Sequence, residues 1–371
     1  MKKLITAIGL MSGTSCDGID LSIIKSNGED LLSLMGDYFF PYEKKTRFKI
    51  RKFKEKIDKV FDLEANKNEI ADLEKEITIL HFKAINIFLE KLKIDKSKID
   101  LVGLHGHTLF HSFHDKKTKQ LGDGIALSKL IGLNVIYDFR ENDLKNGGQG
   151  APLVPIFHKL LQKKLQLRVP VVFVNIGGIS NLTYINKNDE VTSFDSGPGN
   201  FLIDKLIQLK SNDKIQFDKN GEIASKGKID KNILESYLND SYFDSLPPKS
   251  LDVNDFNLSP IRGLSAKNAI TTLSELTSIS IVNSLNFFIQ RPEKIIICGG
   301  GRKNRYIFER IKKMSNIPTL SIDKYKINGD FIESQAFAYL AIRSFLKKPI
   351  SFPKTTGVSK PMTGGKLIEF K

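Results

Sequence analysis

Three short glycine-rich segments carry most of the side chains that could do chemistry. The first, Gly13-Thr14-Ser15-Cys16-Asp17-Gly18, lies between two apolar runs. Glycines at both ends permit a tight turn with exposed backbone N–H groups, and the Thr14 and Ser15 hydroxyls add donors. Such a turn can hold a phosphate chain, and Asp17 can hold Mg²⁺ directly or through water. The alternative is an ordinary hairpin, whose loop needs about two to five residues.

The second segment, Phe194–Asn200, follows a predicted strand and precedes a helical pattern at Phe201–Leu209. Its glycines and proline suit a second phosphate site at a helix N-terminus. Asp195 would then sit at a strand end, where the active sites of α/β proteins collect. The alternative for Asp195 is a carboxylate that caps the helix.

The third segment, Cys298–Asn304, has the same form of strand, glycines and helix. Three adjacent glycines would let a flat adenine or ribose approach the backbone. The P-loop pattern G-x-x-x-x-G-K-[ST] does not occur in the sequence, so the phosphate sites would be of another kind.

Four of the six histidines lie close together in the first half of the chain. Metal binding is one hypothesis. However, no cysteine or carboxylate joins them at ligand spacing, and a Gly-Thr turn interrupts the cluster. Polar lining of a cleft after the predicted strand Asp100–Leu104 is therefore the better interpretation. The four are His105, His107, His111 and His114.

Cys16 and Cys298 lie in separate glycine-rich loops, and no histidine is suggested as a partner for either. We interpret both as incidental small residues rather than nucleophiles. His81 and His158 fall in helical patterns and are predicted to be structural.

Apolar runs of strand length alternate with helical patterns, which indicates an α/β protein. An amphipathic helix is predicted within Glu64–Lys91. Both halves open with a strand, a Gly/Ser turn and a strand, which is a weak repeat of architecture. We divide the chain into domains 1–150 and 151–371, with the last helix, Glu333–Phe345, crossing back to the first. Predicted strands include Leu4–Leu10, Ile19–Ile24, Leu31–Phe40, Asp100–Leu104, Asn134–Asp138, Val169–Asn175, Leu182–Ile185, Val191–Phe194 and Lys294–Cys298.

The composition limits the protein class. The 371 residues are 40% hydrophobic and 27% charged, which excludes a disordered or fibrous chain. Two cysteines exclude a disulfide scaffold, and no apolar run approaches the ~18–20 residues of a membrane span. The net charge of +15 comes mainly from lysine, and no nucleic-acid-binding motif accompanies it. The densest basic stretch, Lys44–Lys59, has helical spacing and is interpreted as a solvated helix face. We therefore expect neither nucleic acid nor membrane as a partner.

The segment Met1–Met11 resembles a short signal peptide, but Leu4–Leu10 is better interpreted as a buried first strand. The protein is accordingly expected in the cytoplasm, with its cysteines reduced.

Nine segments, in order over nearly the whole chain, form a specific combination. In this combination the chain resembles the anhydro-N-acetylmuramic acid kinase family of bacterial cell-wall recycling enzymes. The resemblance implies an α/β, two-domain actin-like ATPase (ribonuclease H-like) fold with a nucleotide cleft between the domains. One position departs from the family pattern. The chain has Gly106-His107-Thr108 where Gly-Gln-Thr is usual, so His107 replaces a glutamine. The segments are Gly9–Asp20, Gly106–His111, Asp138–Arg140, Gly147–Pro155, Asn175–Asn181, Phe194–Asn200, Gly299–Asn304, Asp330–Glu333 and Phe352–Gly357.

The resemblance also implies a reaction, in which ATP phosphorylates O6 of 1,6-anhydro-N-acetylmuramic acid while water opens the anhydro bridge at C1. The products would be N-acetylmuramate 6-phosphate and ADP, with Mg²⁺ as cofactor and a homodimer as the assembly. Asp195 matches the general base, and Arg140, Glu333 and His107 match sugar contacts. Phosphates and metal are assigned to Gly13, Thr14, Ser15, Cys16, Asp17, Gly18, Ile19, Asp20, Gly197, Gly199 and Asn200, with Asp17 as the metal ligand, and the nucleoside to Gly299, Gly300, Gly301 and Asn304.

Three other hypotheses remain at this point. An actin-like kinase of another sugar or carboxylate would use the same phosphate turns. A filament-forming or regulatory actin-like ATPase would polymerise with nucleotide and turn over no sugar. A basic nucleic-acid-binding protein would lose affinity steeply with salt.

Overall fold

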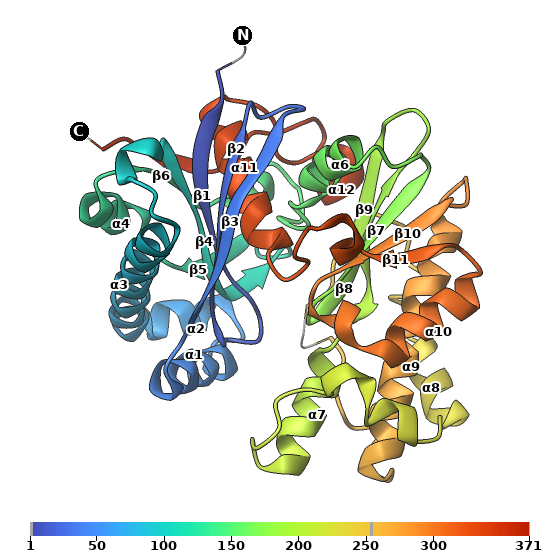
Figure 1. The fold of residues 1–371 in the computed structure, drawn as a ribbon. Helices are drawn as coiled ribbons and strands as arrows, with labels where there is room; N and C mark the ends of the chain where they lie inside the picture. Colours follow the sequence, from blue (N-terminus) through green and yellow to red (C-terminus); the bar gives the residue numbers. More distant parts are fainter. Residues whose placement is uncertain (1–2, 253–254, 371) are drawn as a thin grey trace. The chain divides into compact units, whose positions relative to one another are not determined.

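The computed structural model describes residues 3–252 and 255–370, which form two compact units (Figure 1). Unit 1 comprises the described residues up to Lys164 and those from Phe331 onward, and unit 2 runs from Leu165 to Asp330. The expected division after residue 150 differs from this one, because helix α6 (Pro155–Lys164) packs within unit 1. There Phe157 contacts Tyr339 of helix α11 (Ile332–Phe345), with ring centroids 5.8 Å apart.

Unit 1 is built on a seven-stranded sheet in the order β12-β6-β4-β1-β2-β3, with β5 paired to β4. The first three strands, β1 (Ile5–Ser12), β2 (Gly18–Ser26) and β3 (Leu32–Pro41), are antiparallel. Strands β4 (Leu101–Ser112) and β6 (Asn134–Tyr137) run parallel to β1. All eight residues of β1 are buried, which confirms the predicted buried first strand. The two remaining strands are β5 (Lys117–Leu121) and β12 (Lys366–Ile368).

The helices that accompany this sheet differ in how much of their surface is buried. Helix α3 (Lys67–Leu92) is amphipathic as predicted, and it buries Ile70, Leu73 and Ile77. Helix α11 is buried along most of its length and packs against β1, β2 and β4, so the last long helix returns to the first unit. The basic helix α1 (Lys44–Lys56) buries only Thr46 and Ile50, in agreement with a solvated face. The shorter helices are α2 (Val60–Ala65), α4 (Gly124–Ile131), α5 (Glu141–Lys145) and α12 (Pro353–Thr356).

Unit 2 repeats the same arrangement on a five-stranded sheet in the order β11-β10-β7-β8-β9. Its first three strands, β7 (Val171–Ile176), β8 (Ile179–Ile185) and β9 (Val191–Pro198), are again antiparallel. Strands β10 (Lys294–Cys298) and β11 (Thr319–Ser321) are parallel to β7 and to each other. Both units therefore place their third, second, first and fourth strands in this order, which confirms the predicted architectural repeat and the actin-like α/β fold.

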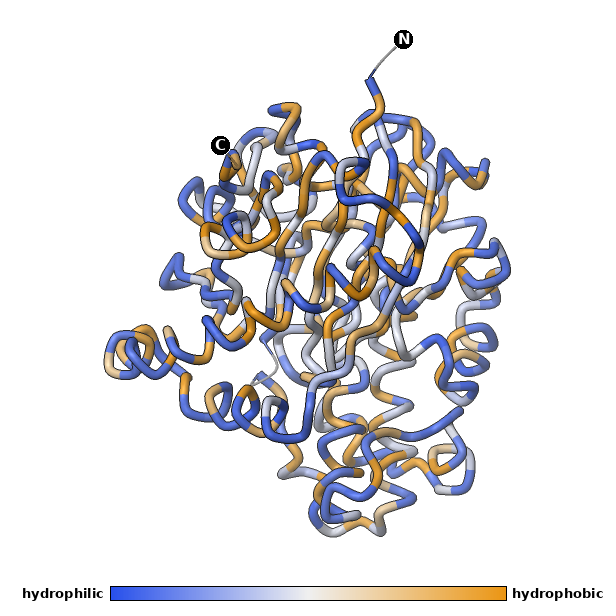
Figure 2. The backbone as a smooth tube through the Cα atoms, turned by 60° about the vertical axis from the view of Figure 1, so that its left-hand side comes forward, coloured by the Kyte–Doolittle hydropathy of each residue, from blue (hydrophilic) through white to orange (hydrophobic). Residues whose placement is uncertain are grey.

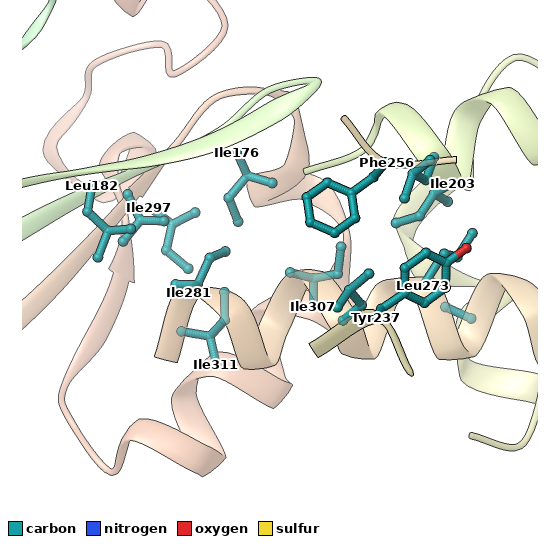
Figure 3. Close-up of a cluster of buried hydrophobic side chains, with 14 of the residues drawn as sticks. Ile176, Leu182, Ile203, Tyr237, Phe256, Leu273, Ile281, Ile297, Ile307 and Ile311 are labelled. Carbon is teal, nitrogen blue, oxygen red and sulfur yellow. The ribbon is translucent and has the colours of Figure 1, made fainter. Parts of the chain in front are cut away.

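The core of unit 2 lies between its sheet and two helices, α9 (Ala266–Ser284) and α10 (Arg305–Ser315). Figure 3 shows Ile281 of α9 and Ile311 of α10 beside Leu182 and Ile297 of the sheet. Apolar segments gather along the strands of both units, and hydrophilic ones in peripheral loops (Figure 2). The other helices are α7 (Phe201–Ser211) and α8 (Lys231–Leu238), and short 3₁₀ turns complete the chain. No helix of the described residues is long and apolar enough to cross a membrane.

Strand β4 departs most from the sequence analysis. The predicted strand ends at Leu104, whereas β4 continues to Ser112 and forms a hairpin with β5. The stretch reads as a polar turn because it is rich in histidine, glycine and threonine. Pairing with β5 and side-chain hydrogen bonds within unit 1 satisfy its polar groups, so this tertiary context overrides the local pattern.

Candidate active site

The turn between β1 and β2 is a hairpin loop whose tip is exposed. Thr14, Ser15 and Asp17 are exposed, whereas Cys16 is buried and adopts the left-handed conformation with φ 55°. The Cys16 N–H donates to the Gly13 carbonyl at 3.1 Å, and the Ser15 hydroxyl donates to the Asp17 carboxylate at 2.5 Å. The hairpin alternative and an exposed phosphate turn are thus compatible.

The rest of the predicted phosphate segment belongs to strand β2. Gly18 and Ile19 are buried there, and Asp20 is partly buried opposite Met11 of β1. Ile19 has its side chain in the core of unit 1, so it can offer a ligand only its backbone.

Arg140 is held in unit 1 by His105 and by a backbone carbonyl. Its Nε and Nη2 donate to His105 Nε2 at 3.1 and 3.0 Å, and its Nη1 donates to the Gly150 carbonyl at 2.7 Å. Because a guanidinium can only donate, His105 Nε2 is unprotonated. Burial, with Arg140 beside it, lowers the pKa of His105 well below the usual range, so the ring stays neutral.

Glu333 lies in the first turn of α11 and is partly exposed. Burial of its carboxyl raises the pKa of Glu333, and the nearby Arg140 charge opposes that shift. Helix α11 is fixed against this region by Phe337, whose ring lies 4.2 Å from that of His105. Two of the predicted sugar contacts, Arg140 and Glu333, are thus brought together within unit 1.

His107, the third predicted sugar contact, is fully buried in β4. Its Nδ1 lies 3.2 Å from Ser12 Oγ and its Nε2 lies 3.7 Å from Cys16 Sγ. Both ring nitrogens are therefore engaged by the β1–β2 hairpin. The interpretation of Cys16 as an incidental residue without a histidine partner is wrong, because the parallel pairing of β1 and β4 brings His107 to it.

The sequence analysis missed the role of Asp143. This buried carboxylate accepts from the Gly150 N–H at 2.6 Å and from Thr356 Oγ1 at 2.6 Å. It thereby joins Gly147–Pro155 to Phe352–Gly357, two of the segments that carry the family resemblance. Since the Gly150 carbonyl accepts from Arg140, Asp143 also helps to orient the guanidinium. A single aspartate in a helical pattern gives no sequence signal for this role.

Three glycine turns of unit 2 meet at Asn200. The Asn200 N–H donates to the Gly177 carbonyl at 2.8 Å, and its side-chain amide donates to the carbonyls of Ile176 and Gly177. A Cβ added to Gly199 would lie 2.4 Å from the Gly177 oxygen, and one added to Gly301 would lie 2.2 Å from Ile176 Cγ2. Only glycine leaves room for these contacts, with the Gly177 backbone in the first case and the Ile176 side chain in the second.

This junction changes the predicted roles of the second segment. The N–H groups of Gly199 and Asn200, which were expected to face a phosphate, donate to the carbonyls of Gly178 and Gly177 instead, and the Phe201 N–H also donates to Gly178. Gly199 and Asn200 therefore hold the Gly177–Gly178 turn, which is partly exposed. Gly197, at the end of β9, packs against Ser280 of α9 and against Phe243.

Asp195 lies within strand β9 and is nearly buried, at 7% exposure. Its Oδ2 accepts from the Leu251 N–H at 2.9 Å, and its carbonyl accepts from the Tyr242 hydroxyl at 2.6 Å. The N-cap residue of α7 is Asn200, so the capping alternative for Asp195 is wrong. Leu251 thus contacts the carboxylate and Tyr242 the backbone of Asp195, although nothing in the sequence pattern indicates these contacts.

The glycine triplet after β10 is positioned by Arg302. Its Nε donates to Asp323 at 2.7 Å, and its Nη1 donates to Asp330 at 2.6 Å and to the Gly299 carbonyl at 3.0 Å. These ion pairs raise the pKa of Arg302 against the opposing effect of burial, and they lower the pKa values of both aspartates. Nothing lies within 4 Å of a Cβ added to Gly300, so this glycine faces open space.

Asn304, predicted near the nucleoside, caps helix α10. Its side chain accepts from the Ile307 N–H at 3.2 Å. Of the third segment, Gly300 therefore offers the open backbone, while Gly299, Gly301 and Asn304 shape the loop.

Comparison with known proteins decides the family. A family model described as anhydro-N-acetylmuramic acid kinase matches residues 5–369. The chain belongs to the anhydro-N-acetylmuramic acid kinase family. It is 44% identical to the anhydro-N-acetylmuramic acid kinase of Pelagibacter ubique, with all of both chains covered. It is 39% identical to that of Rhizobium etli, with 99% of each covered, and 37% identical to that of Zymomonas mobilis, with 97% and 99% covered.

Membership of the anhydro-N-acetylmuramic acid kinase family does not favour the other hypotheses. A nucleic-acid-binding protein or an actin-like filament protein would not be expected to match this family from end to end. The family segments instead fall on the β1–β2 hairpin, the surroundings of Arg140, the glycine turns of unit 2 and the two loops that Asp143 joins.

Replacement of Arg302 tests its part in shaping the glycine loop after β10. We expect Arg302→Met to raise KM for ATP roughly tenfold and to lower stability by about 1–3 kcal/mol at pH 7, because a charged hydrogen-bond network is lost. The pKa values of Asp323 and Asp330 are lowered in the folded protein. This stabilisation is therefore fully present above pH ~4 and is lost as the pH falls further. ATP titrations and urea unfolding at several pH values measure both effects.

The control is Arg305→Met, which removes an exposed arginine at the start of α10. An equal rise in KM for ATP in both variants would contradict a positioning role for Arg302.

Proposed function

We propose that this protein is an ATP-dependent kinase that opens the 1,6-anhydro ring of 1,6-anhydro-N-acetylmuramic acid with water and phosphorylates O6. The products are N-acetylmuramate 6-phosphate and ADP. Family membership supports the substrate, and a reaction that consumes ATP is expected in the cytoplasm. The observation that carries the proposal is the position of Asp195 on β9, the strand that leads directly into the glycine junction at Gly199 and Asn200.

In the proposed reaction Asp195 removes a proton from water, and the water oxygen attacks C1 of the sugar. The C1–O6 bond breaks, and O6 takes the electron pair and attacks the γ-phosphorus of ATP. ADP leaves, and the proton on Asp195 passes to solvent. The low exposure of Asp195 supports this role, because a base shielded from bulk solvent limits competing hydrolysis.

The phosphates of ATP would be bound mainly by backbone groups and hydroxyls. In unit 1 these belong to the β1–β2 turn, with Thr14 and Ser15 exposed at its tip. In unit 2 the Gly177–Gly178 turn is the partly exposed surface, and Gly300 gives open backbone for the nucleoside. Phosphoryl transfer needs mainly positioning and neutralisation of charge, which such turns supply.

Mg²⁺ in kinases is bound by one or two carboxylates, water and substrate phosphates rather than by a complete protein cage. Within residues 3–252 and 255–370, no three His, Cys, Asp or Glu side chains gather as a metal site. The exposed Asp17 carboxylate, oriented by Ser15, fits this sparse kind of site. When bound, Mg²⁺ would neutralise phosphate charge beside Asp17.

Arg140 and Glu333 would bind the sugar. The planar guanidinium suits the lactyl carboxylate, and the orientation imposed by His105 and Gly150 supports this assignment.

The test is mass spectrometry of the product formed from the anhydro-sugar and ATP in ¹⁸O-water. The product is reduced at once with borohydride, so that slow exchange at C1 does not change the label. We expect one ¹⁸O at C1 and one phosphate on the sugar. A phosphorylated sugar without the label would instead indicate a plain kinase and overturn the proposed water attack. N-acetylmuramate 6-phosphate incubated in the same water measures the background exchange.

A further inference from the structure

Four buried side chains form a continuous line from the start of α1 to the tip of the β1–β2 turn. The Tyr42 hydroxyl donates to Ser12 Oγ at 3.3 Å, and Ser12 Oγ lies 3.2 Å from His107 Nδ1. His107 Nε2 lies 3.7 Å from Cys16 Sγ, which donates to the Thr14 carbonyl at 3.4 Å. All four side chains are at most 5% exposed.

One arrangement of protons satisfies every group in this line, and it starts from the Tyr42 hydroxyl. In this arrangement Tyr42 uses its single proton on Ser12, and Ser12 donates its own proton to His107 Nδ1. A neutral imidazole that accepts at Nδ1 carries its proton on Nε2, which then points to the Cys16 sulfur. The Cys16 thiol donates in turn to Thr14. Each donor is used once, and no acceptor in the line faces another acceptor.

The neutral ring is consistent with its surroundings. Burial lowers the pKa of His107 to about 3, and the nearby Lys54 charge acts in the same direction. Burial likewise raises the pKa of the Cys16 thiol, so the sulfur keeps its proton. The line therefore joins uncharged groups.

The turn needs such support because Cys16 adopts a left-handed backbone, with φ 55°. A residue with a Cβ is strained in that conformation and keeps it only where its surroundings impose it. The buried thiol is held between His107 and the Thr14 carbonyl, while Thr14, Ser15 and Asp17 on either side stay exposed.

We propose that His107 is a positioning residue that, through Ser12 and Cys16, holds the β1–β2 turn in the conformation that binds the phosphates of ATP. The proposal rests on the proposed function of this turn, and it replaces the predicted contact of His107 with the sugar. His107 acts on nucleotide binding without touching the nucleotide.

The test compares two substitutions at this position. His107→Gln keeps an acceptor for Ser12 and a donor for Cys16, whereas His107→Phe fills the space of the ring and removes both bonds. We expect His107→Phe to weaken binding of a non-hydrolysable ATP analogue about tenfold or more, and to change KM for the sugar less than about threefold. His107→Gln should stay within about threefold of the parent in both. The buried His158 of α6, changed to Phe, is the matched control for loss of a core histidine.

Calorimetry of the ATP analogue without sugar keeps this test separate from the proposed reaction, because it needs no turnover. An equal loss for both ligands, a loss confined to the sugar, or failure of His107→Gln to restore binding would overturn the proposal. If His107→Phe does not fold, Cys16→Ala and Cys16→Ser provide the same comparison at the other end of the line. Weak analogue binding in the alanine variant with recovery in the serine variant would support it, and equal binding in both would refute it.

Discussion

An Asp195→Asn variant is expected to lose about 10³–10⁴-fold in kcat while it still binds ATP. The asparagine side chain can accept the Leu251 N–H that Asp195 Oδ2 accepts, and the backbone bonds to Lys249 and Tyr242 do not involve the carboxylate. The variant should therefore fold normally, with Tm within about 3 °C of the parent. What it lacks is a group that can take a proton from water. Product formation from the anhydro-sugar and ATP measures the loss, and calorimetry with an ATP analogue measures binding.

Asp244→Asn is the matched control, because Asp244 is an exposed aspartate in the segment that contacts Asp195. Near-parental kcat in Asp195→Asn would contradict its assignment as the base. If Asp195→Asn loses ATP binding as well as turnover, Asp195 shapes the nucleotide site instead.

Replacement of Arg140 is expected to have the second largest effect. Arg140→Met removes two hydrogen bonds to His105 and one to the Gly150 carbonyl, together with the charge beside Glu333. We expect kcat/KM for the sugar to fall roughly 10²–10³-fold, since each charged hydrogen bond contributes about 1.5–3 kcal/mol. Steady-state kinetics with the sugar varied at saturating ATP measure this fall, and KM for ATP should change little.

Arg140→Lys separates charge from geometry. A lysine keeps the positive charge but cannot present a planar fork, so we expect it to recover less than about a tenth of the lost activity. Full recovery would show that only the charge matters.

The Arg140→Met variant should also show a shifted pH dependence. Arg140 opposes the rise that burial causes in the pKa of Glu333. Without Arg140 that pKa rises further, so the acid limb of kcat/KM for the sugar should move to higher pH in Arg140→Met. An unmoved acid limb would indicate that the ionised Glu333 is not needed for sugar binding.

Local sequence pattern was sufficient for much of the fold. The runs that became β1, β2, β7 and β10 were predictable, because each is a short, largely apolar stretch that ends at glycine or polar residues. Helix α3 was predictable because its apolar residues recur every three to four positions. The extension of β4 was not, since its polar residues are stabilised by partners distant in sequence.

The pairing of chemical groups was much less predictable. Cys16 and His107 are 91 residues apart, and Asp143 and Thr356 are 213 residues apart. Which of them meet depends on strand order and register, and no local pattern carries that information. At Gly199 and Asn200 the local pattern was misleading. It is typical of a helix start with free N–H groups, but these N–H groups donate to the carbonyls of Gly178 and Gly177.

The sequence alone therefore determined the family and the α/β class, and it predicted which glycine-rich segments could bind phosphate, because glycines, acids and apolar runs form recognisable patterns at short range. Only the tertiary structure decided which of those residues face outward and which hold others in place. Parallel pairing of β1 with β4 directed His107 into the hairpin rather than to solvent. Close backbone packing at Asn200 likewise turned a predicted phosphate site into the support of another turn.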